Sequence, residues 1–172
     1  IACHERTGVG GIAPERNVNF TGTREALGDQ GRLPPPLTHV GAKLKPEWIT
    51  EVLLRGKRQR DYLDAAMPQF GEANVGSLVD LFGKVDHLEA VASPNVANIQ
   101  ESKNAGHVMM GTTGLSCIAC HDFNGQKSGG AGALDIVHST ERLKKNWFHL
   151  FLRDPARFHP TVAPIGPRRQ LI

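Results

Sequence analysis

Three cysteines and eight histidines carry the most distinctive chemistry of this 172-residue chain. Cys117 and Cys120 are separated by two residues, and His121 follows directly. An odd number of cysteines argues against a simple framework of disulfides. A tetrahedral zinc site needs four ligands, and a second pair of cysteines at this spacing is absent. A thioredoxin-like pair would accompany a strand–helix–strand pattern, which we do not find.

The segment CIACH, Cys117 to His121, has the CxxCH pattern by which c-type haem is attached to a protein. Residues three apart on a helical turn share a face, so both thiols can reach the vinyl groups of one porphyrin edge and form thioethers. The imidazole of His121 then lies beneath the ring and can bind the iron. The pattern predicts covalently bound haem here, with a chance match as the alternative.

The chain opens with IACH, which repeats the last four residues of CIACH at an offset of 117 residues. The position equivalent to Cys117 would lie before residue 1. We interpret Cys3 and His4 as the end of a second haem-attachment segment. Two alternatives stay open, namely a haem held by the single thioether of Cys3 and a coincidental match.

A second match lies further along the chain, at an offset of 99 residues. The segment Leu37–Gly56 resembles Leu134–Asp154, with Leu44, Trp48 and Leu53 opposite Leu143, Trp147 and Leu152. Such self-similarity indicates two copies of one structural unit. Both segments predict helices, with Pro46 in the first turn and Gly56 just past the end of one, and Pro155 ending the other. We expect both tryptophans in the core, with donation to a haem propionate as the alternative.

Met67 and the proline after it follow the first of these segments. The thioether of methionine is a soft ligand that suits haem iron opposite a histidine, and Pro68 stiffens the loop. We expect Met67 to bind the iron held by His4, although a lone methionine often only fills a core. The apolar pattern of Ala73–Glu89 then predicts a closing helix over the haem.

The order of these features resembles a tandem pair of cytochrome c modules. The resemblance covers residues 1–89 closely, continues past a linker at 90–98, and covers 99–172 as an apparently incomplete second module. It implies an all-α fold with long irregular loops around two haem c groups. It also implies the ligand sets, which are Cys3, His4 and Met67 for one haem and Cys117, Cys120 and His121 for the other.

The second copy departs from this pattern because Ala163 and Pro164 stand where the first has Met67 and Pro68. Alanine cannot bind iron, so three interpretations of the sixth ligand remain open. The ligand lies beyond Ile172, or a histidine replaces it, or the second iron is five-coordinate. His159 is nearest to the expected position, followed by the other candidates His138, His149 and His107.

Composition sets further bounds on the function. Aromatic residues make up only 6% of the chain, so a large cofactor could supply apolar volume that the side chains lack. The net charge of +3 and the absence of a basic aromatic platform argue against nucleic-acid binding. No apolar run is long enough to span a membrane. The basic stretch Arg55–Arg60 is expected to be a solvated helix end, with propionate pairing or steering of an acidic partner as alternatives.

The resemblance implies electron transfer outside the cytoplasm, in a periplasm or at a cell surface, with other redox proteins as partners. Two alternatives are a peroxidase-like haem enzyme with an open second iron, and the cytochrome subunit of a larger redox complex. His and Met ligation should give the first haem the higher potential.

Overall fold

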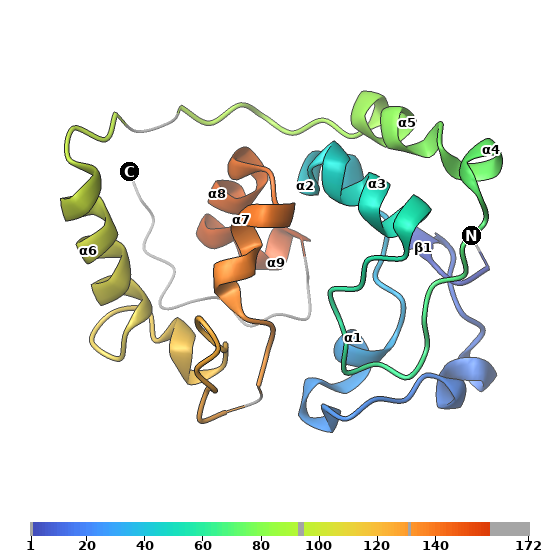
Figure 1. The fold of residues 1–172 in the computed structure, drawn as a ribbon, viewed down its shortest axis with the longest axis horizontal. Coiled ribbons are helices and arrows are strands. Elements are labelled where there is room, and N and C mark those ends of the chain that lie inside the picture. The colour runs from blue at the N-terminus through green and yellow to red at the C-terminus, as the bar shows by residue number, and fades with distance from the viewer. Residues whose placement is uncertain (1, 93–94, 131, 159–172) are drawn as a thin grey trace.

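The structure is a computed structural model that describes residues 2–92, 95–130 and 132–158. The described chain is mostly helical, with one two-stranded hairpin and long loops between short helices (Figure 1). The predominantly helical fold was predicted, whereas the hairpin was not. The assigned boundaries of two modules and a linker stay a prediction.

The hairpin follows directly after His4. Strands β1 (Glu5–Arg6) and β2 (Val9–Gly10) pair antiparallel, with Glu5 opposite Gly10 and Arg6 opposite Val9. Thr7 and Gly8 form the turn, and both have positive φ, as the commonest two-residue hairpin turn requires. Each strand has only two residues, which is too short for a period-two pattern to reveal it in the sequence.

Short helical segments lead from the hairpin to the region of the first repeat. They are the 3-10 helices η1 (Pro14–Asn19) and η2 (Glu25–Leu27), followed by α1 (Gly28–Arg32). Arg32 holds this region together, because its guanidinium donates to the carbonyl of Phe20 at 3.0 Å and to Asp29 at 2.7 Å.

The predicted helix of the first copy is two helices, α2 (Val40–Lys43) and α3 (Pro46–Arg55). Leu44 and Lys45 are extended between them. Pro46 explains part of this break, because the residue before a proline disfavours the helical conformation. The far end of α3 follows the prediction, since Gly56 caps it with a φ of 67°.

The second copy repeats this arrangement. The 3-10 helix η4 (Ile136–His138) and α7 (Ser139–Arg142) precede α8 (Lys145–Arg153). Helix α8 ends before Pro155, as predicted, and α9 (Pro155–Phe158), which was not predicted, follows. Leu143 and Lys144 are extended, although no proline follows them. The break in the second copy therefore has a cause other than proline.

That cause is a pairing between the two breaks. Leu44 and Leu143 form an antiparallel bridge. The N–H of Lys45 donates to the carbonyl of Arg142, and the N–H of Lys144 donates to the carbonyl of Lys43, both at 2.8 Å. We call this pairing the junction. It brings α2 and α3 beside α7 and α8 in the middle of the molecule (Figure 1).

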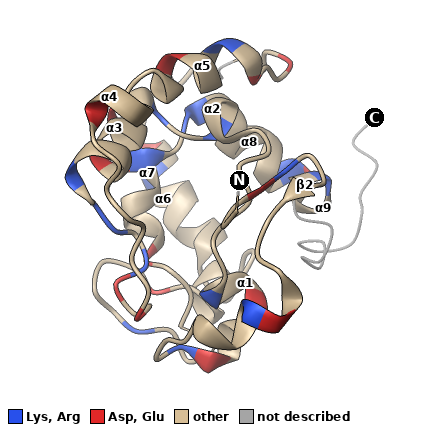
Figure 2. Ribbon diagram, turned by 90° about the vertical axis from the view of Figure 1, so that its right-hand side faces the viewer, with Lys and Arg blue, Asp and Glu red and all other residues tan. Residues whose placement is uncertain are grey.

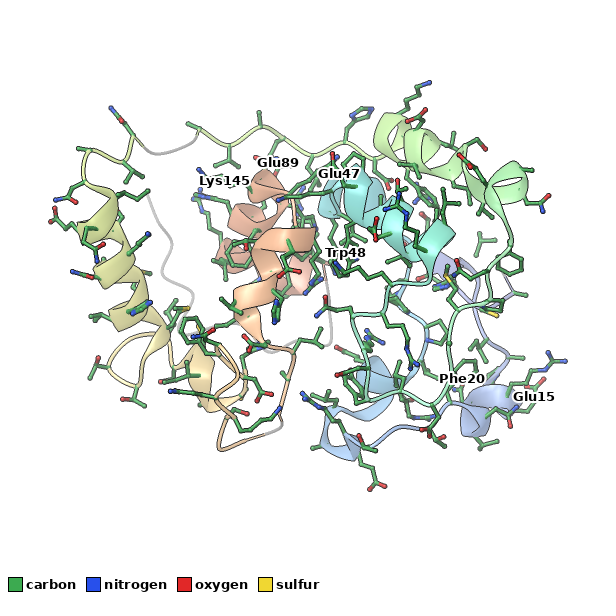
Figure 3. The ribbon with its side chains drawn as sticks, in the orientation of Figure 1. Glu15, Phe20, Glu47, Trp48, Glu89 and Lys145 are labelled. Carbon is green, nitrogen blue, oxygen red and sulfur yellow. The ribbon has the colours of Figure 1, made fainter. Side chains whose placement is uncertain are left out.

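The core around the junction is small. Its buried apolar residues are Val40, Ala42, Trp48, Ile49, Leu143 and Trp147. Both tryptophans are thus in the core, as predicted, at 7% and 4% exposure. Figure 3 shows Trp48 at the centre, between α3 and α7. Among the described residues, no large side chain is completely buried.

The predicted closing helix is also two helices, α4 (Glu72–Val75) and α5 (Leu78–Val85). Helix α5 packs on α2 and α3. Gly41 makes this contact possible, because a Cβ there would lie 2.9 Å from the nitrogen of Gly83 and closer still to the carbonyl of Phe82. The apolar face of α5 is only partly covered, however, since Leu81 and Val85 are about half exposed.

The described residues between α5 and α6 (Ile99–Met110), 86–92 and 95–98, form an irregular stretch along one side of the molecule (Figure 1). Its first part is held against α8, where the N–H of Val91 donates to Asn146 at 2.8 Å. Asn98 caps α6 by accepting from two backbone N–H groups. In the described part of the chain, no helix is long and apolar enough to cross a membrane.

Candidate haem-binding sites

The segment CIACH is one tight helical turn, as predicted. The 3-10 helix η3 spans Cys117–Ala119, and the N–H groups of Cys120 and His121 donate to the carbonyl of Cys117 at 3.2 and 2.9 Å. Side chains three apart eclipse each other in a 3-10 helix, which brings the two thiols to the same side. Both thiols are free, and Cys120 is exposed.

His121 is oriented by a hydrogen bond from its other ring nitrogen. Nδ1 lies 2.9 Å from the carbonyl oxygen of Leu134. A carbonyl only accepts, so Nδ1 carries the proton and the lone pair is on Nε2. This is the tautomer that a metal-binding imidazole needs, and such a bond also fixes the orientation of the ring.

His4 has the same arrangement at the other site. Its Nδ1 donates to the carbonyl oxygen of Pro35 at 2.7 Å. The two histidines are 117 residues apart, and their acceptors Pro35 and Leu134 are 99 apart, which are the two offsets of the sequence comparison. The structure therefore places His4 and His121 in equivalent surroundings.

A second hydrogen bond repeats at the same offsets. At each site, the carbonyl of the residue after the histidine accepts a hydrogen bond from a backbone N–H. That N–H belongs to the residue two positions after the one whose carbonyl accepts from the histidine. Leu37 donates to Glu5 at 2.7 Å, and Ile136 donates to Asp122 at 3.0 Å. Each histidine is thus held by a pair of bonds to one loop. The sequence analysis missed these acceptors, although the offset of 99 aligns them.

A buried carboxylate supports each site. At the first, Asp86 is 7% exposed and pairs with Arg6 at 2.6 Å, and it also accepts from the N–H of Gly41 at 2.8 Å. This fastens the hairpin after His4 to the start of α2 and the end of α5. At the second, Asp122 directly follows His121 and is 2% exposed.

Asp122 accepts from the N–H of Ser128 at 3.0 Å and from Lys127 at 2.9 Å. These bonds, the backbone one first, hold the pKa of Asp122 below its usual range. Arg24 also approaches it, at 3.5 Å, and donates to the carbonyl of Gly132. A residue of the first copy therefore holds the loop that carries His121.

The glycine-rich loop after CIACH folds back against it. The N–H of Ala133 donates to the carbonyl of Cys120 at 2.8 Å. A Cβ on Gly130 would lie 2.5 Å from the carbonyl oxygen of Ala119, so only glycine fits this approach. These contacts pack the loop against the cysteine turn.

Met67 lies in the irregular segment 56–71 between α3 and α4, and it is half-buried. Contacts with the loop before η2 hold the middle of this segment, where Asp64 accepts from the hydroxyl of Thr21 at 2.6 Å and Leu63 bridges to Gly22. Gln69 donates to the carbonyl of Val52 at 3.3 Å. The role of Met67 as the sixth ligand stays a prediction.

The sixth ligand of the second site is not identified. His159, Ala163 and Pro164 lie outside the described residues. His138 is engaged by Glu141 at 2.8 Å, and this bond raises the pKa of His138. His107 packs edge-on against Phe123.

Apolar side chains that lead into and through CIACH face solvent. They are Val108, Met109, Leu115 and Ile118, with exposures of 62, 54, 46 and 36%. The core is small, and these exposed apolar side chains form a surface that a flat, largely apolar macrocycle would cover. The residues present therefore fit a haem at CIACH.

Neither of two surface cavities explains these sites. One of about 670 Å³ is lined by residues that include Glu89, His149 and Arg157. The other, about 320 Å³, is lined by residues that include Trp48 and Asp122. His4 and His121 are not among the described residues that line either cavity. No group of three or more His, Cys, Asp or Glu side chains within the described ranges could hold a metal ion directly.

Comparison with known proteins found no relatives of this chain. No protein-family model, no curated protein and no solved structure matches it.

Proposed function

We propose that this protein is a dihaem c-type cytochrome that transfers electrons between other redox proteins. One observation carries the proposal. At both CH pairs, the Nδ1 of the histidine donates to a backbone carbonyl, at 2.7 and 2.9 Å, and the acceptors are related by the internal repeat. A chance CxxCH pattern gives no reason for a second histidine to be held in the same way.

The chain's own residues would attach and orient the two cofactors. Cys117 and Cys120 would form thioethers at the second site, and Cys3 would form one at the first. His121 and His4 would each offer the Nε2 lone pair that their Nδ1 bonds leave free. Bound haem supplies one-electron exchange between ferric and ferrous iron, with the electron taken from one redox protein and passed to another.

The two sites are proposed to differ in potential. Met67 would complete the first site, and a thioether opposite a histidine raises the potential. The second copy has Ala163 at the corresponding position. We therefore expect the first haem to have the higher potential, which would give electron flow a direction. Two equal potentials in a redox titration would contradict this difference.

The substitution of Ala163 for methionine also favours a second candidate function. If no other residue completes the second site, it would bind a small molecule such as peroxide, and the protein would be a haem enzyme. Carbon monoxide added to the reduced protein distinguishes the two. An unchanged spectrum would mean that both sites have two axial ligands, and the enzyme candidate would then fail.

The proposed setting follows from covalent haem attachment, which takes place outside the cytoplasm. We place the protein in a periplasm or at a cell surface, with other redox proteins as its partners, as a free carrier or within a larger redox complex. Electron-transfer partners of this kind meet through small, transient interfaces.

The test is to produce the chain in cells that attach haem and to measure intact mass and the pyridine haemochrome spectrum. We expect two haems per chain. The variant Cys117→Ser,Cys120→Ser should lose one of them, whereas Ser116→Ala, beside the same turn, should keep both. A protein with no covalent haem would overturn the proposal, and a double variant that keeps as many haems as the wild type would overturn the assignment of CIACH.

A further inference from the structure

The junction has local two-fold symmetry. Besides the reciprocal backbone bonds, Lys45 Nζ donates to the carbonyl of Thr140 and Lys144 Nζ donates to the carbonyl of Gly41, both at 2.7 Å. Each of these pairs is related to the other by the offset of 99 residues. The two copies therefore use equivalent positions toward each other, as in an isologous interface.

This symmetry brings two cations together. Lys43 and Arg142 occupy equivalent positions, at the ends of α2 and α7 next to the bridge of Leu44 and Leu143. Figure 2 marks the basic positions of α2 and α7. The ammonium of Lys43 lies 4.7 Å from the ring centre of Trp147 in the other copy. The Nε of Arg142 is buried and has no hydrogen-bond partner.

Arg60 is a third cation, and after burial its charge contributes to lowering the pKa of Lys43 and of Arg142. We call Lys43, Arg60 and Arg142 the cluster. Arg60 belongs to the stretch expected to be a solvated helix end, and that expectation is wrong for this residue, which is half-buried. Its guanidinium donates to the carbonyls of Leu33 at 2.8 Å and Gly31 at 3.2 Å. Leu33 lies two residues before Pro35, which accepts from His4, so Arg60 is tied to the loop of the first site.

The three cations have no described counter-ion. Every ion pair among the described residues involves other cations, and the buried carboxylates Asp86 and Asp122 are already paired. Burial first, then Arg142 and Arg60, lower the pKa of Lys43 to about 8. Like charges that are held partly out of water without an anion are costly. We therefore expect the cluster to bind an anionic ligand with more than one negative charge.

The symmetry also limits what the ligand is. Equivalent cations from two equivalent copies suit two equivalent anionic groups, one associated with each copy. A haem carries a pair of propionate carboxylates, and the planar guanidinium group matches the geometry of a carboxylate. Both histidine loops lead to the cluster, the first through Leu33 and Arg60, and the second through Leu134, η4 and α7.

Building on the proposed function, we infer that Lys43, Arg60 and Arg142 form one binding site at the junction for propionate carboxylates of both haems. The cluster would then hold the acidic edges of two cofactors next to the contact between the copies. Its positive charge would favour the reduced form at both sites. Loss of one cation should consequently lower both potentials.

The test is a redox titration of the full dihaem protein with Arg142→Gln and, separately, Lys43→Gln. We expect each variant to lower both midpoint potentials, with about a tenfold change in the reduction equilibrium, or ~59 mV for a one-electron couple. Arg142→Lys keeps the charge and should restore most of the shift. Lys45→Gln removes a junction cation that already has a carbonyl partner, so its potentials should stay near those of the wild type.

Infrared difference spectra of the oxidised and reduced protein give a second measurement. With isotope-labelled propionates, the carboxylate bands should shift in Arg142→Gln but not in Lys45→Gln. Unchanged potentials and bands in both cluster variants of a protein that retains two haems would overturn the inference alone. Wild-type potentials that follow the concentration of added phosphate would also overturn it, in favour of a solution anion. A protein without haem would overturn the proposed function as well.

Discussion

Gly41 allows the contact of α2 with α5, and its replacement gives a sharp test of the fold around the first site. In Gly41→Ala the new Cβ would lie 2.9 Å from the nitrogen of Gly83, whereas ordinary contact begins at 3.4 Å. The two helices would have to separate by about 0.5 Å at this atom and by more at the carbonyl of Phe82. Because the N–H of Gly41 also donates to Asp86, the movement would disturb the anchor of Arg6.

Overpacking of this kind costs about 1–3 kcal/mol, and the backbone contact puts Gly41→Ala near the upper end. Alanine regains about 0.5–1 kcal/mol through its higher helix propensity, which leaves a loss of about 2 kcal/mol. For a chain of this size, 1 kcal/mol shifts Tm by about 2–4 °C, so we expect Tm to fall by about 4–8 °C.

Gly83→Ala is the matched control, because a Cβ at this position of α5 would meet nothing within 4 Å. It should raise Tm by about 1–4 °C through helix propensity alone. Thermal unfolding followed by far-UV circular dichroism measures both variants. If Gly41→Ala unfolds at the wild-type temperature, or if both variants lose stability equally, the close contact of α2 with α5 is refuted.

Two further predictions concern the buried carboxylates. Arg6→Gln leaves Asp86 buried without its cation and should lower the free energy of unfolding by about 3 kcal/mol. The control Arg55→Gln breaks the exposed pair with Glu51 and should lower it by less than about 1 kcal/mol. Equal losses of the two variants in denaturant titrations would contradict the role of Asp86. Asp122 has a pKa below its usual 3.8, so its contribution to stability is present above that pH and is lost as the pH falls through the lower folded value. The Tm of Asp122→Asn should therefore fall less steeply than that of the wild type as the pH drops below 3.8, and parallel curves would show that the bonds of Asp122 do not matter.

Local signals in the sequence were sufficient where the cause is local. The cysteine turn at CIACH, the start of α3 at Pro46 and its end at Gly56 depend on residues within a few positions of one another. The burial of Trp48 and Trp147 followed from their place on apolar faces. These elements could be predicted because helix caps and spacing act over single turns.

The features that orient the candidate sites could not be predicted in this way. The carbonyls of Pro35 and Leu134 accept from the two histidines. Every residue has a backbone carbonyl, so the residue types at these positions do not identify them as acceptors. The hairpin after His4 is too short to give a pattern. Only the comparison of the two copies at an offset of 99 residues contains the signal, because it aligns both acceptors and both junction cations.

The same comparison predicts a stabilising substitution in the second copy. Lys145 is equivalent to Pro46, begins α8 and follows the extended Lys144, whose φ of −70° and ψ of 134° suit a residue before proline. Lys145→Pro should thus stabilise the protein by about 0.4–1 kcal/mol by restricting the unfolded chain.

Lys144→Pro, one position earlier, is the contrasting variant because the N–H of Lys144 donates to the carbonyl of Lys43 across the junction. Its free energy of unfolding should fall by about 1–3 kcal/mol because the carbonyl of Lys43 is left without its donor. Lys144→Ala would show how much of that loss comes from the side chain's hydrogen bond to the carbonyl of Gly41. Since no proline breaks the second copy, pairing across the junction must hold Leu143 and Lys144 extended. Equal stability of the two proline variants would mean that this pairing is absent, and with it the shared geometry that brings Lys43 and Arg142 together.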